Sequence, residues 1–219
     1  MADLFDKLYA IMINDLGNLG YKYASLHQFK LAKLITTKLF EYDSDNYIAH
    51  AIDIKMNIEM KKFDYCYRQY TKIFVKNNIE MKHLLPYYAI SLCLSTNTDN
   101  KTQGNDMFTS LLANIETYDP NDKNQIWRWY AYKLQYCDTE YNKAIEYYNK
   151  TMSNTDNIKY PPIMMEMGKC YLELNNINKA KECIQYSLDN GKDVFYNIQK
   201  EYDTIMTSIN NATKQGLHL

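Results

Sequence analysis

The chain of 219 residues is 46% hydrophobic and 23% charged, a balance typical of folded proteins that excludes wholesale disorder. Its formal net charge of -1 gives no global electrostatic reason to bind nucleic acid or an anionic membrane. Only 6 glycines and 4 prolines are present, which disfavours a β-rich fold with many turns and favours long helices joined by short turns.

The cysteines and the first residues indicate an intracellular protein. Five cysteines are present, an odd number without any Cys-x-x-Cys pair, so we expect reduced thiols that pack as small apolar side chains. No apolar run approaches the roughly 18 residues of a membrane span, and residues 1–6 carry acids but no basic stretch. We therefore expect a soluble, cytoplasmic chain without membrane insertion.

A pairing of a bulky residue with a small residue three positions later recurs along the chain. Phe29 and Ala32 are matched 34 residues later by Phe63 and Cys66. The pairing returns further along, at Tyr141 and Ala144 and at Ile177 and Ala180. A period of this length is typical of stacked two-helix units, so the sequence predicts an all-α helical-hairpin solenoid.

Aligning the small residues predicts about five units, at residues 13–46, 47–80, 85–118, 125–158 and 161–194. In each unit a first helix, A, is followed by a tight turn and a second helix, B. The turns are expected at polar stretches, residues 26–28, 61–62, 98–100, 138–140 and 175–176.

A helical stripe of bulky residues follows the fifth unit: Phe195, Ile198, Tyr202, Ile205 and Ile209. Polar residues lie between them, so one side of such a helix can cover the end of a stack while the other meets water. We expect a capping helix at about 194–212, a single array over 1–212, and a flexible tail at 213–219.

Two units carry a further motif. Residues 19–23 read Leu-Gly-Tyr-Lys-Tyr and precede Ala32, and residues 167–171 read Met-Gly-Lys-Cys-Tyr and precede Ala180. This pattern resembles the tetratricopeptide repeat (TPR) superfamily, whose units place Leu-Gly-x-x-Tyr in helix A and Ala in helix B. The resemblance covers roughly residues 13–194. It implies a right-handed superhelix whose concave wall is formed by the A helices, with small residues where helices A and B cross closely.

The third unit departs from this pattern. Leu92 stands where the small residue of helix A belongs, and Lys101 stands where the aromatic residue of the turn belongs, although Gly104 and Phe108 fit helix B. The unit is either a degenerate repeat or a bend in the array.

The resemblance also implies which side chains face the concave groove. The proposed partner-binding residues are Lys55, Ile126, Trp129, Lys133, Tyr136, Met165, Lys169 and Leu172. The three lysines would form a column that suits an acidic ligand, or they would be ordinary solvated lysines paired with nearby acids such as Glu59 and Glu173. The aromatic and apolar residues would form a patch that suits a hydrophobic anchor, unless the tryptophan packs between units.

No set of residues for catalysis or metal binding is recognisable. The four histidines are scattered without metal-ligand spacing, and there is no glycine-rich phosphate loop or nucleophile elbow. The sequence therefore predicts a protein that is not an enzyme and uses no cofactor and no metal.

Three non-catalytic roles remain. The leading hypothesis is a protein-interaction module, an adaptor or assembly subunit, that holds a partner peptide or helix in its groove. The alternatives are a dedicated chaperone that shields one apolar client, and a structural protein that forms homo-oligomers through its C-terminal helix. No nucleic-acid partner is expected.

Overall fold

A computed structural model describes residues 2–79, 81–153, 159–195 and 197–214. The chain forms two compact units, Met1–Ser91 and Leu92–Leu219. Over the described residues the regular elements are helices, with no strand, so the predicted all-α class is confirmed. None of the described helices combines the length and the apolar character needed to cross a membrane.

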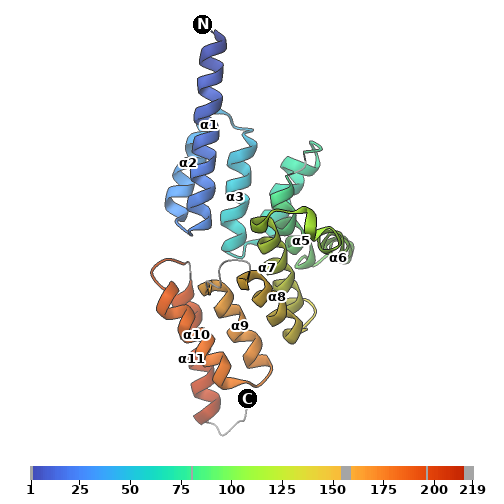
Figure 1. The fold of residues 1–219 in the computed structure, drawn as a ribbon, viewed down its shortest axis with the longest axis vertical. Helices are drawn as coiled ribbons and strands as arrows, with labels where there is room; N and C mark the ends of the chain where they lie inside the picture. Colours follow the sequence, from blue (N-terminus) through green and yellow to red (C-terminus); the bar gives the residue numbers. More distant parts are fainter. Residues whose placement is uncertain (1, 80, 154–158, 196, 215–219) are drawn as a thin grey trace. The chain divides into compact units, whose positions relative to one another are not determined.

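The first unit is built from helices that pack as neighbouring pairs. They are α1 (Ala2–Ser25), α2 (Phe29–Tyr42), α3 (Tyr47–Glu59) and α4 (Phe63–Tyr70), followed by a π-helical turn (Thr71–Val75), a short 3-10 turn (Lys82–Leu84) and α5 (Leu85–Cys93), which ends in the second unit. α1 pairs with α2, and α3 packs against both of them and against α4 (Figure 1). Contact between α1 and α3, the first helices of successive hairpins, is the contact that a hairpin stack requires.

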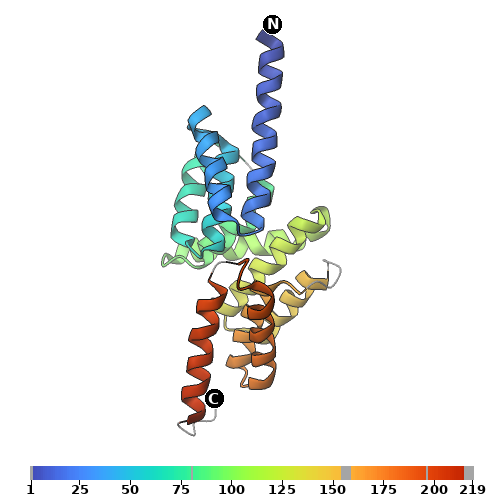
Figure 2. The ribbon, with the colours of Figure 1, turned by 90° about the vertical axis from the view of Figure 1, so that its left-hand side faces the viewer.

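The second unit repeats this arrangement. Its helices are α6 (Thr98–Ala113), α7 (Pro120–Tyr136), α8 (Tyr141–Ser153), α9 (Pro161–Glu173), α10 (Ile177–Gly191) and α11 (Ile198–Lys214), with a 3-10 turn (Ile115–Thr117) before α7. α7 pairs with α8 and α9 with α10, while α8 also packs against α9. α11 lies along the α9–α10 hairpin, as Figure 2 shows.

Four of the turns between helices A and B share one backbone device, and the turn between α5 and α6 lacks it. His27, Lys61, Thr139 and Asn175 all have positive φ, between 55° and 59°. The Glu140 N–H after Thr139 reaches six residues back, to the Leu134 carbonyl at 2.9 Å. At the other three turns the next residue's N–H closes onto a carbonyl five residues back, as from Gln28 to Tyr23 at 2.9 Å and from Asn176 to Tyr171 at 2.8 Å. This is the Schellman ending of a helix. Its recurrence gives the repeat a structural basis that is independent of side-chain similarity.

Close crossing of paired helices explains the glycine of the motif. A Cβ atom built on Gly168 of α9 would collide with Ile184 of α10 and come within 3.3 Å of the Ala180 carbonyl oxygen. On Gly20 of α1, a Cβ atom would lie 2.6 Å from Ile52 Cδ1 of α3, in the next hairpin, and 3.1 Å from Ile35 Cγ2 of the paired helix α2. A larger side chain at Gly168 would push α9 and α10 apart, as the sequence predicts for helices A and B of one unit. At Gly20 the tightest contact is instead between successive hairpins.

Each unit has its own apolar interior. In the first unit, Ala24, Ala32, Leu39 and Ile52 are fully buried between α1, α2 and α3. In the second unit one cluster joins α7, α8, α9 and α10, and a second cluster, which includes Met165 and Ile198, lies where α9 and α10 meet α11. The cores therefore lie between neighbouring helices rather than at one centre, as stacked hairpins require.

Short polar side chains set where several helices begin. The side chains of Asn46, Asn97, Asp119 and Asn176 accept backbone N–H groups of the first helical turn. Capping of this kind contributes about 1 kcal/mol per helix. It also corrects one prediction: residues 98–100, expected as a turn, form the first turn of α6, because Asn97 accepts the N–H groups of Asp99 and Asn100.

The terminal helix begins later and ends later than predicted. α11 starts at Ile198 rather than 194 and continues to Lys214, so residues 213 and 214 of the expected tail are helical. Residues 215–219 lie outside the described residues. α7, by contrast, begins earlier than predicted, at Pro120 rather than 125. Asp119 caps it, and proline is well accommodated in the first helical turn.

Candidate binding surfaces

Three of the predicted groove residues are interior. Ile126, Trp129 and Met165 are buried, and Trp129 is 2% exposed. The Trp129 ring packs against Tyr132, with ring centroids 5.6 Å apart, and Met165 packs in the cluster that includes Ile198 of α11. These side chains stabilise the helix packing and offer no surface to a partner, which corrects their assignment to a groove wall.

Four others lie at least partly at the surface of the second unit. Lys133 and Tyr136 are on α7, and Lys169 and Leu172 are on α9. Tyr136 is 42% exposed. Lys133 forms an ion pair with Asp138 at 2.6 Å, so its charge is answered within the chain.

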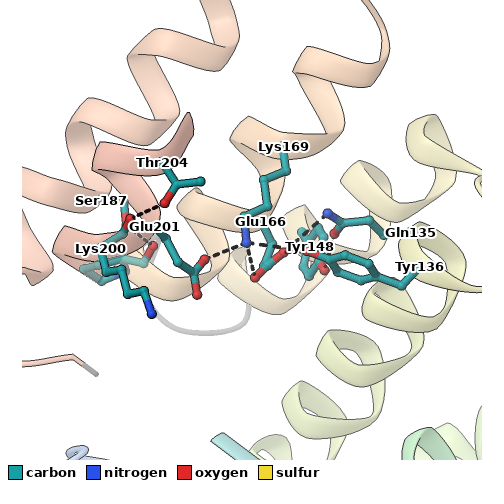
Figure 3. Close-up of polar contacts among 10 residues, drawn as sticks. Gln135, Tyr136, Tyr148, Glu166, Lys169, Ser187, Lys200, Glu201 and Thr204 are labelled. Carbon is teal, nitrogen blue, oxygen red and sulfur yellow. Dashed lines mark hydrogen bonds and ion pairs between the residues drawn. The ribbon is translucent and has the colours of Figure 1, made fainter. Parts of the chain in front are cut away.

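A carboxylate that the sequence analysis did not select joins Tyr136 to Lys169. Glu166 of α9 is 7% exposed, and its Oε2 accepts the Tyr136 hydroxyl at 2.6 Å (Figure 3). Its Oε1 accepts Lys169 Nζ at 3.0 Å. Lys169 Nζ is also 3.5 Å from the Tyr136 hydroxyl oxygen, so the three side chains form one contact between α7 and α9.

The cluster extends inward to α8. Gln135 Nε2 donates to Glu166 Oε2 at 3.3 Å, and Gln135 Oε1 accepts the buried Tyr148 hydroxyl at 2.8 Å. Burial, and next the field of Glu166, raise the pKa of Tyr136 and the pKa of Tyr148 above the ordinary tyrosine value. Both hydroxyls therefore remain proton donors at neutral pH.

The cluster extends outward to α11. Lys169 Nζ donates to Glu201 Oε2 at 2.6 Å, so the ammonium group lies between two carboxylates in Figure 3. We call Gln135, Tyr136, Tyr148, Glu166, Lys169 and Glu201 the α7–α11 network. Its two carboxylates and one ammonium group leave no excess positive charge, which disfavours the acidic-ligand interpretation of Lys169.

A sequence signal for Glu166 exists. It precedes Lys169 by three residues on one helix, the spacing at which opposite charges pair. Glu59 and Glu173, which the sequence suggests as partners of Lys55 and Lys169, lie four residues further along the same helices. Glu201 has no such local signal, because its contact depends on how α11 packs.

Lys55, the remaining predicted residue, lies in the first unit. Its Nζ is 5.6 Å from the centre of the Tyr21 ring, within the range of a cation–π contact. The Tyr21 hydroxyl is in turn 2.8 Å from His83 Nε2. Lys55 is therefore part of a polar and aromatic contact between α1, α3 and the turn before α5.

The groups that could support chemistry are few. No cluster of three or more metal-ligating side chains occurs in the described part of the chain. Burial raises the pKa of the Cys66, Cys93 and Cys170 thiols to about 12. Desolvation also raises the pKa of the Cys137 thiol, although that residue is exposed as a whole. Thiols held in the protonated form are poor nucleophiles.

Comparison with known proteins gives limited information. No family model matches the chain. No curated protein sequence matches it either. Among solved structures, that of PilF from Pseudomonas aeruginosa, determined for its functional characterisation, is similar, with 18% sequence identity, a TM-score of 0.44, and coverage of 94% of this chain and 90% of that one. A likeness of this quality carries no argument about the architecture, which rests on the helix pairing within each unit.

Proposed function

We propose that this chain is a non-catalytic protein-interaction module of the TPR type, a single array over residues 1–212. The repeated positive-φ turns and the small residues at helix crossings support this assignment. In such an array the A helices would line the concave side of a right-handed superhelix, and a partner peptide or helix would lie along them.

The contact between Tyr136 and Lys169 is the observation that carries the proposal. It brings accessible polar groups from α7 and α9, the first helices of successive hairpins, to within 3.5 Å of one another. Leu172, one turn further along α9, adds a partly buried apolar side chain. Together with Lys133, these residues form what we call the α7–α9 face, to which we assign the partner in the second unit. In the first unit Lys55 takes the equivalent role.

This face would suit a segment with a hydrophobic anchor and hydrogen-bonding groups. Tyrosine is frequent at binding hot spots because it buries a large area with few rotatable bonds. Since Lys133 and Lys169 are already paired with acids, a strongly acidic partner is not required on this face.

Site-specific photo-crosslinking in the native cell tests the proposal. A photoreactive phenylalanine analogue at Tyr136 should crosslink to one main protein partner. The same analogue at Tyr42, a tyrosine of similar exposure at the end of α2, is the matched control. Crosslinking to the same set of proteins from both positions, or to none from Tyr136, would remove this face from consideration.

The self-association alternative has less support. The apolar stripe of α11 is covered within the chain, since Ile198 and Ile209 are buried and Ile198 packs against Met165 and Ile184. A homo-oligomer would therefore need another surface. Crosslinking would identify the partner of a dedicated chaperone and of an adaptor alike. The two roles would differ in the solubility of that partner, because the client of a chaperone would become insoluble when the chain is absent.

A further inference from the structure

An open cleft lies in the first unit, and none of its lining residues is one that the sequence analysis assigned to binding. Residues of α2, of α3 and of the start of α4 line it, and its volume is about 640 Å³. This is within the size range of ligand-binding pockets, which is roughly 300–1,000 Å³.

One part of the lining is apolar. Phe29 at the start of α2 and Met56 and Met60 at the end of α3 contribute it. Methionine side chains are flexible and polarisable, so they adapt to apolar groups of different shape. The cleft can therefore accept a hydrophobic side chain of a ligand.

The rest of the lining is charged and mainly positive. Lys30, Lys33 and Lys62 are exposed, and Asp53 is the acidic residue of the lining. Three lysines against one aspartate leave an excess of two positive charges. Asp53 is already bonded: its Oδ2 accepts the Tyr65 hydroxyl at 2.5 Å and its Oδ1 accepts Lys33 Nζ at 3.4 Å.

The lysines are placed to receive more than one anionic group. Lys30 and Lys33 are three residues apart on α2, and Lys62 precedes α4. The Lys33 side chain is 60% exposed, so pairing with Asp53 does not withdraw it from solvent. An inorganic anion would satisfy lysines but leave Phe29 and Met60 uncovered, whereas an acidic segment with an apolar side chain would satisfy both.

We propose that this cleft binds an acidic peptide segment of a partner protein, with carboxylates at Lys30, Lys33 and Lys62 and one apolar side chain against Phe29 and Met60. The site is distinct from the α7–α9 face around Tyr136. A partner could thus contact the chain at two surfaces of different chemistry.

Fluorescence anisotropy with the full chain tests the proposal. The probe is a labelled peptide of sequence Asp-Glu-Leu-Asp-Glu. The double variant Lys30→Gln and Lys62→Gln should weaken its binding about tenfold, since two charge contacts with the carboxylates of the peptide are lost. Asp53→Asn, which keeps an oxygen for Tyr65, should tighten binding, because it removes the one opposing charge.

The controls separate specific binding from general attraction. Lys22→Gln removes one positive charge, as each single change of the double variant does, at an exposed site on α1 that does not line the cleft, and it should leave the affinity unchanged. Urea unfolding checks that each variant is folded.

Three results would overturn the proposal. They are undetectable peptide binding, equal affinity of the wild type and the lysine double variant, and equal affinity of a peptide with glycine in place of leucine. None of them would alter the crosslinking expected at Tyr136, so this proposal and the assigned function can fail separately.

Discussion

Each unit holds a nearly buried carboxylate on the first helix of a hairpin, and the two differ in what surrounds them. Asp53 of α3 is 8% exposed and Glu166 of α9 is 7% exposed. Both accept a tyrosine hydroxyl and a lysine ammonium group. A buried carboxylate is stable only with such partners, so the same requirement is met twice.

The two carboxylates differ in how far their surroundings enclose them. Glu166 is enclosed by side chains from α7 and α9, and its lysine is held in turn by Glu201 of α11. Asp53 borders an open cleft, and its lysine is mostly in solvent. A closed network fixes helices relative to one another, whereas an open one leaves cations available to a ligand.

The largest effect is expected from Glu166→Ala. It leaves Tyr136 and Gln135 without their acceptor, and buried polar groups that lose a charged partner cost about 2–3 kcal/mol. Urea unfolding should show this loss in the free energy of unfolding. Glu173→Ala, an exposed acid on the same helix, should change stability by less than about 0.5 kcal/mol. Equal losses in both variants would show that the network does not stabilise the unit.

Asp53→Ala should cost less, about 1–2 kcal/mol, because Lys33 can return to water. Tyr65→Phe removes the same hydrogen bond from the other side and should cost about 1 kcal/mol. In a double-mutant cycle the two losses should not add, since they break one interaction. Strictly additive losses would contradict the bond between Tyr65 and Asp53.

The local part of this fold could be predicted from the sequence. The turns at His27, Lys61, Thr139 and Asn175 fall within predicted stretches, because a helix end depends on a few neighbouring residues. The missed turn has the same cause: Asn97, one residue before the expected turn, is a better cap than the residues within it.

The sequence left open whether Trp129 packs between units or faces the groove, and it could not decide between the two. Helical periodicity gives the direction of a side chain, but the width of the buried stripe depends on how many neighbours a helix has. α7 packs against α6, α8 and α9, so side chains on several of its faces are covered. Residues assigned to a groove by repeat position alone were therefore partly interior ones.

The two carboxylates also act on neighbouring thiols. Burial, and next the field of Asp53, raise the pKa of Cys66 from 9.0 to about 12; burial and Glu166 do the same for Cys170. Because the folded state favours the protonated thiol, this stability is fully present below pH 9 and is lost as the pH rises toward 12.

Between about pH 8 and pH 10, each such thiol should lower the free energy of unfolding by about 1 kcal/mol. Cys170→Ala should show a correspondingly shallower decline when unfolding is measured across this range. A slope identical to that of the wild type would mean that Cys170 titrates normally in the folded chain. The same measurement on Cys66→Ala compares the effect of Asp53 on the pKa of Cys66 with the effect of Glu166 on the pKa of Cys170.

The smallest effect is expected from Glu201→Gln, which breaks the outer link of the α7–α11 network. Lys169 and Glu201 are 21% and 25% exposed, so water and salt weaken their attraction, and the loss should be about 0.5 kcal/mol. Lys169 keeps Glu166 at 3.0 Å, and α11 remains held by the packing of Ile198. The loss should shrink at high salt, since screening weakens a partly exposed pair. A loss as large as that of Glu166→Ala, unchanged by salt, would instead show that the pair of Lys169 and Glu201 contributes as much stability as Glu166. The distinction between a closed and an open carboxylate would then no longer hold.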